Sequence, residues 1–161
     1  MILDLQEKFS GTTTAAGVTT GDAITVTAIS SNVLDLRNAA TPALGDEGIS
    51  GPEMWLVVQV TDNAFTAAGA ATLTITLESD SAATLASAPV VHYSTTAIPK
   101  ATLVIGYVAV RQFLPSGDYK RYLGLRYTVA TGPMTAGNVV AFLTPDVARN
   151  VIYPTGYTID V

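Results

Sequence analysis

The sequence predicts an all-β protein, an antiparallel two-sheet sandwich with a jelly roll as the preferred topology. About eight or nine short runs rich in Val, Ile, Thr and aromatic residues alternate with Gly, Pro, Asn and Asp. No long segment has the apolar period of a helix. Long loops lie between several of these runs, as expected where a chain crosses between sheets. An immunoglobulin-like sandwich is the alternative, but its Cys, Trp, Cys spacing is missing because the chain has no cysteine.

The central element of this prediction is a strand over residues 54–61. It is apolar at almost every position, and turn residues flank it at Gly51-Pro52 and Asp62-Asn63. Successive side chains of a strand point to opposite faces, so a neighbouring layer must cover each face of this one.

The chain before this strand is predicted to begin with an extended arm over residues 1–21. The arm is followed by two strand pieces within 22–36, with a bend at Ser30-Ser31-Asn32, and by a long surface loop over 37–52.

The chain after this strand is predicted to form further antiparallel strands. The 64–70 segment is interpreted as a loop, and the cleanest alternation in the sequence, over 72–79, predicts a half-buried strand. Residues 102–113 and 119–130 flank turn residues at 115–118 and are predicted to form a hairpin. The other predicted features are a connection over 80–88, a short strand over 89–94, a break at Ile98-Pro99, a buried strand over 138–143, a turn over 145–150 and a final edge strand over 151–161.

Composition indicates one domain over residues 1–161 that needs no disulfide or metal to fold. The mean hydropathy is +0.38, but the longest uncharged apolar run, residues 101–110, is about half the ~20 residues of a membrane helix. The first residues lack the pattern of a secretory signal. We therefore expect no membrane partner and synthesis in the cytoplasm.

Low charge is the most unusual property of the chain. Charged residues make up 13% of it, about half of the usual ~25%. Charges normally protect exposed sheet edges from association, so we expect other subunits to cover much of the surface. The net charge of −5 and the scattered Lys and Arg argue against a nucleic-acid partner.

Little in the sequence points to catalysis. His92 is the only histidine, and no Gly-x-Ser-x-Gly turn or phosphate-binding glycine loop is present. We expect no enzyme activity, no cofactor and no metal site. A glycosidase-like carboxylate pair or a structural calcium ion stays an alternative for the acids. The candidate acids are Asp46, Glu47, Glu53, Glu78, Asp80, Asp118 and Asp146.

Two groups of residues are candidates for a partner interface. Arg111, Arg121 and Arg126 gather with Lys120 and several tyrosines around the predicted hairpin. They either extend along an exposed edge or anchor a protein contact. The second group consists of apolar residues in the predicted arm, where nothing nearby would cover them. Its members are Ile2, Leu3, Leu5 and Phe9.

Several segments, in order and spacing, resemble the jelly-roll capsid cement or decoration proteins of tailed bacteriophages. In the second half these are Arg121-Tyr-Leu-Gly-Leu-Arg-Tyr-Thr-Val129, Gly132-Pro-Met-Thr-Ala-Gly137, Val140-Ala-Phe-Leu-Thr144 and Tyr153-Pro-Thr-Gly-Tyr-Thr-Ile159. In the first half they are Met1-Ile-Leu-Asp4, Ser31-Asn-Val-Leu-Asp-Leu36 and Trp55-Leu-Val-Val-Gln-Val60.

This resemblance implies a structural virion protein. Such proteins bind the outer surface of the phage head as homotrimers and stabilise the lattice of the major capsid protein. The implied partners are thus copies of this chain and the capsid protein. A carbohydrate- or cell-surface-binding jelly roll is the alternative function.

Overall fold

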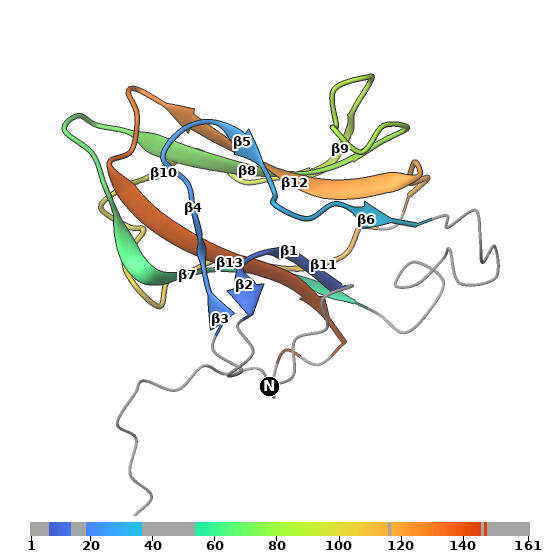
Figure 1. The fold of residues 1–161 in the computed structure, drawn as a ribbon, viewed down its shortest axis with the longest axis horizontal. Coiled ribbons are helices and arrows are strands. Elements are labelled where there is room, and N and C mark those ends of the chain that lie inside the picture. The colour runs from blue at the N-terminus through green and yellow to red at the C-terminus, as the bar shows by residue number, and fades with distance from the viewer. Residues whose placement is uncertain (1–6, 14–18, 37–53, 116, 146, 148–161) are drawn as a thin grey trace, which may run out of the picture.

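The computed structural model describes residues 7–13, 19–36, 54–115, 117–145 and 147, and two layers of antiparallel strands make up its fold (Figure 1). No helix among these residues is long and apolar enough to cross a membrane. The predicted all-β sandwich is confirmed.

The lower layer in Figure 1 is a five-stranded sheet with β7 and β13 at its centre. Its strands, in spatial order, are β1 (Lys8–Ser10), β13 (Ala136–Thr144), β7 (Trp55–Thr66) and β11 (Val108–Phe113), and β4 (Asp22–Ala23) also pairs with β13. A two-stranded sheet of β2 (Thr12–Thr13) and β3 (Thr19–Thr20) is formed separately.

The upper layer is a six-stranded sheet with β8 and β12 at its centre (Figure 1). Its main path runs through β10 (Ile98–Pro99), β8 (Thr72–Asp80), β12 (Tyr122–Ala130) and β5 (Ala28–Ile29). Two further strands extend it, because β9 (Val90–Ser94) pairs with β8 and β6 (Leu34–Asp35) pairs with β12.

The strand pairing is nested in the order of a jelly roll. β1 pairs with β13, β5 and β6 with β12, β7 with β11, and β8 with β9 and β10. Early strands thus pair with late ones in reverse order, as in a long antiparallel hairpin that has been rolled up. The rolling brings β7 beside β13 and β8 beside β12.

The main core lies between the two layers. It is formed by the alternate residues of each central strand, as the period of two predicts. From β7, β8 and β12 it contains Leu56, Val58, Val60, Leu73, Ile75, Leu77, Leu123, Leu125 and Tyr127. On the opposite face of the first sheet, Val57, Val140 and Phe142 form a second buried cluster. The predicted central strand is therefore confirmed, with buried residues on both of its faces.

The predicted hairpin between residues 102–113 and 119–130 is wrong. β11 pairs with β7 in the first sheet, whereas β12 pairs with β8, β5 and β6 in the second, so the turn residues connect two layers. The first strand is also shorter than predicted. Residues 100–102 and 105–106 form turns, and Gly106 has a φ of +86°, a conformation that favours glycine.

Other predicted boundaries shift by a few residues. β7 continues through part of the predicted 64–70 loop, and the predicted break at Ile98-Pro99 is a short strand beside β8. The predicted strands within 72–79, 89–94 and 138–143 are confirmed as β8, β9 and β13. The predicted 37–52 loop and final 151–161 strand lie outside the described residues.

The predicted extended arm is only partly correct. Strands β1, β2 and β3 lie within residues 1–21, and Phe9 has an exposed fraction of 0% in the main core. The sequence did not predict this burial, because the apolar residues of the segment follow no regular period. Ile2, Leu3 and Leu5 lie outside the described residues.

Candidate interaction surfaces and reactive groups

His92 is part of a compact cluster with Ser79 and Tyr119. Its Nε2 lies 2.7 Å from the Ser79 hydroxyl, and its ring stacks on Tyr119 at 4.1 Å between centroids. The Lys120 backbone N–H donates to the same Ser79 oxygen at 3.0 Å. Burial lowers the pKa of His92, which favours the neutral ring.

This serine–histidine pair has the spacing of a nucleophile and its base. Ser79, however, has an exposed fraction of 0%. A hydroxyl without exposed surface offers no approach to a substrate carbonyl. The cluster instead joins β8, β9 and the segment that leads into β12.

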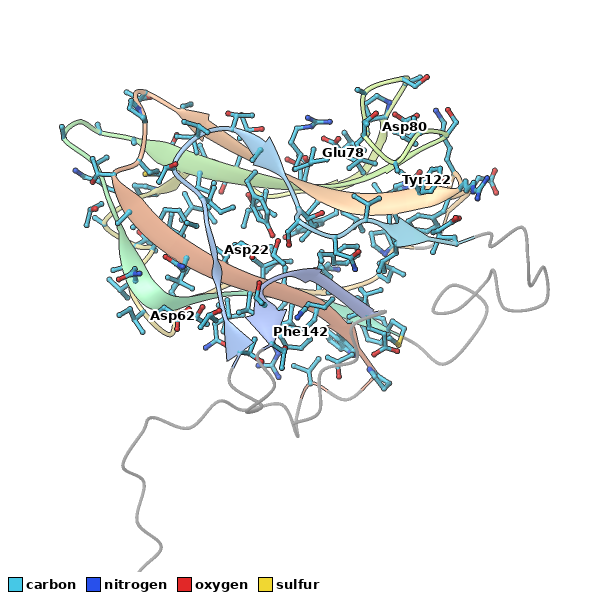
Figure 2. All side chains as sticks on the ribbon, viewed as in Figure 1. Asp22, Asp62, Glu78, Asp80, Tyr122 and Phe142 are labelled. Atoms are coloured by element: carbon cyan, nitrogen blue, oxygen red, sulfur yellow. The ribbon has the colours of Figure 1, made fainter. Side chains whose placement is uncertain are left out.

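Two of the candidate acids, Glu78 and Asp80, lie buried on the outer side of the second sheet (Figure 2). Both oxygens of Asp80 accept backbone N–H groups from the 81–89 loop, with donors at Ser81, Ser87 and Ala88. Burial opposes ionisation of Asp80, but these hydrogen bonds outweigh it and hold its pKa below the usual range. Asp80 thus fixes the loop that follows its own strand.

Arg126 holds Glu78 and the same loop together. Its guanidinium Nε lies 2.9 Å from Glu78 Oε2, and Nη2 donates to the Leu85 carbonyl at 2.6 Å. Leu85 is fully buried above Gly124, where a Cβ would lie 2.8 Å from the Leu85 Cδ1. Arg126 is therefore a structural residue that clamps the 81–89 loop to β12.

The other two arginines of the predicted interface lie apart from Arg126. Arg121 forms an exposed ion pair with Asp35 at 2.9 Å and lies 4.9 Å from the centre of the Tyr122 ring. Arg111 is exposed on β11, in the other sheet. The predicted arginine group is therefore divided between two layers. Arg111 belongs to β11, whereas Arg121 and Arg126 lie at or in β12, and these two strands do not pair with each other.

No group of three or more His, Asp or Glu side chains that could hold a metal ion occurs within the described residues. Glu78 and Asp80 both point outward from β8, yet one contacts Arg126 and the other the loop backbone. Of the remaining candidate acids, Asp118 is exposed. Asp46, Glu47, Glu53 and Asp146 lie outside the described residues.

The apolar residues that the structure shows as exposed differ from those predicted, and most of them lie between residues 90 and 108. In the described part of the molecule six large apolar residues are exposed, and one of them is Val26. The other five are Val90, Val91, Val104, Ile105 and Val108. The sequence signal that could have indicated this surface is the absence of Asp and Glu from residue 81 to residue 117.

A family model described as Bbp16 matches residues 18–143. The match covers the strands from β3 to β12 and most of β13. No curated protein matches the chain.

Proposed function

This chain belongs to the Bbp16 family, and from that premise we propose that it is a structural virion protein of a tailed bacteriophage. In this proposal it is a capsid cement or decoration protein. It is made in the host cytoplasm, binds the outer surface of the head and stabilises the lattice of the major capsid protein. It acts together with copies of itself, and its sequence resemblance implies a homotrimer.

The observation that carries the proposal is the nested jelly-roll pairing, which agrees with the fold that the sequence resemblance implies. Fold alone does not define function. The fold supports the proposal more strongly here because the described groups that could act in catalysis have structural partners within the molecule. Ser79 is buried against His92, and Glu78 and Asp80 hold the 81–89 loop.

The mechanical demand on such a protein also fits this structure. A cement protein must transmit force between its contacts, which requires a body that deforms little. Each layer here is tied by long antiparallel ladders, of which β7 with β13 and β8 with β12 are the longest. Several identical weak contacts of an oligomer add up to strong attachment to a lattice.

The proposal is tested with phage heads assembled without this protein. Purified protein is added, co-sedimentation with the heads measures binding, and the temperature at which DNA is released measures stabilisation. We expect saturable binding and release at a higher temperature. Heads that neither bind the protein nor gain stability would contradict the proposal, and specific binding to glycans instead would support the carbohydrate-binding alternative.

A further inference from the structure

One side of the sandwich ends in strands that each have a single partner within the described residues. β9 and β10 pair only with β8, and β11 pairs only with β7. Residues 99–107 connect the two layers on this side, because Lys100 N–H donates to the Ala71 carbonyl and Phe65 N–H to the Leu103 carbonyl. We call this side, residues 90–113, the open edge. The longer strands of this edge, β9 and β11, each have a row of backbone groups that faces away from the sheet.

The open edge also holds the exposed apolar side chains. Ile105 is 60% exposed, Val91 and Val104 are each 53% exposed, and Val90 and Val108 are each 42% exposed. These residues come from β9, from the connection between β10 and β11, and from the start of β11. Apolar side chains beside unpaired strand edges are the combination that favours association with another strand.

Charge is distributed unevenly around this side. Residues 81–117, which include the open edge, carry Lys100 and Arg111 and no acid. The rest of the chain carries the other six basic residues and all thirteen acids. Two copies of net charge −5 repel each other least where acids are absent.

From these three observations we infer that the open edge is the surface through which one copy of this chain binds a second copy. A second copy supplies what the edge lacks: an apolar surface and a further strand edge, with no acid on either side of the contact. The inference deepens the proposed function, on which it rests, by assigning the contact between subunits.

The test measures the mass of the full chain by sedimentation over a range of concentrations. The variant Ile105→Asp places a charge at the most exposed large apolar residue of the open edge. Val26→Asp is the matched control, since Val26 is 58% exposed outside this edge. We expect wild type and Val26→Asp to sediment at a multiple of 16.7 kDa. Ile105→Asp is expected to weaken self-association at least tenfold.

Circular dichroism accompanies each measurement, and Ile105→Ser provides a second variant that removes apolar surface without adding charge. If Ile105→Asp loses its β spectrum, the mass of Ile105→Ser decides the question. A wild type of 16.7 kDa at all concentrations, or equal masses for wild type and the edge variant, would overturn the inference.

Binding to heads separates this inference from the proposed function. An edge variant that keeps its oligomeric mass but no longer binds heads would assign the edge to the capsid, which overturns the inference. An oligomeric wild type that depends on Ile105 but never binds heads would support the inference and contradict the proposed function.

Discussion

The Tyr127 hydroxyl lies 2.8 Å from the Ser10 hydroxyl, and both groups are buried. Tyr127 belongs to β12 in the second sheet and Ser10 to β1 in the first, so this hydrogen bond connects the two layers through the core. The residue before Ser10 is Phe9, whose ring is fully buried. Residues close to the N-terminus are thus a structural part of the sandwich.

Removal of residues 1–10 is therefore predicted to destabilise the whole protein. Loss of the buried Phe9 side chain alone corresponds to about 3 kcal/mol or more. Removal of residues 1–6 keeps Phe9 and Ser10 and is expected to cost less. Denaturant unfolding measures both changes, and equal stability of the two truncations would contradict this prediction. Attachment to heads is tested separately by substitution of Ile2, Leu3 and Leu5 with Ser, because these changes keep the buried Phe9 and Ser10.

Arg126→Met is predicted to lower the free energy of unfolding by about 2 kcal/mol, because it leaves the Glu78 carboxylate buried without its cation. Arg126 itself is 30% exposed and Glu78 only 5%, so the loss falls below that of a fully buried pair. The matched control is Arg121→Met, which removes an exposed pair with Asp35 and is expected to change stability little.

The double variant Arg126→Met with Glu78→Leu separates the causes. Because it removes the buried charge together with its partner, we expect it to be more stable than Arg126→Met alone. Urea unfolding of the four proteins gives the coupling between the residues. Additive losses at Arg126 and Glu78 would show that their ion pair contributes nothing.

Gly137→Ala is predicted to be much more harmful than Gly132→Ala. Both glycines have positive φ, +144° and +102° respectively. A Cβ at Gly137 would lie 2.4 Å from the buried Phe65 ring, whereas one at Gly132 would have no atom within 4 Å. We expect a loss of about 3 kcal/mol at Gly137 and about 1 kcal/mol at Gly132, measured by thermal unfolding. Similar losses would contradict the role of Phe65.

His92 is predicted to titrate below its ordinary pKa of 6.5, because burial favours the neutral ring. The unfolded chain then binds the proton more readily, so the contribution of His92 to stability is present above pH 6.5 and is lost as the pH falls through the lowered pKa. As the only imidazole, its NMR titration is unambiguous. His92→Gln is expected to flatten the pH dependence in this window. A folded pKa at or above 6.5 would refute the prediction.

Asp80 is predicted to affect the pH dependence of stability at a lower pH than His92 does. Its pKa lies below 3.8 in the folded protein, so its stabilisation is present above pH 3.8 and disappears as the pH falls through the folded value. Asp80→Asn is expected to unfold at a lower temperature than wild type at pH 7. This difference in unfolding temperature is expected to shrink in acid. The control is Asp118→Asn at an exposed position. A difference that stays constant down to pH 2 would contradict the assignment to the Asp80 charge.

The strands that the sequence predicted best are those whose own alternation records which side faces the core. Leu73, Ile75 and Leu77 alternate with threonines, and each is fully buried in β8. The predicted strand pairing was wrong where a strand pairs with a partner that is distant in the sequence. The turn residues after Phe113 reverse the chain, but they do not say which sheet receives the next strand.

The candidate site shows the same division. Arg126 was predicted, from its place in the supposed hairpin, to extend along an exposed edge or to anchor a partner contact. Its partners Glu78 and Leu85 lie 48 and 41 positions away in sequence. Phe9 was expected to be exposed because it lies in a segment that was predicted to be an extended arm. Neither assignment could be made from local pattern, since burial depends on what packs above a residue.

By itself the sequence determined the all-β class, the positions of the central strands and the low charge of the surface, because each follows from the chemistry of consecutive residues. Tertiary structure alone decided the nested pairing, the docking of Phe9 and Ser10, and the exposure of Ile105 and its apolar neighbours at the open edge. The physical reason is that side-chain alternation fixes which face of a strand is buried, whereas the position of that strand within its sheet depends on contacts between residues far apart in the chain.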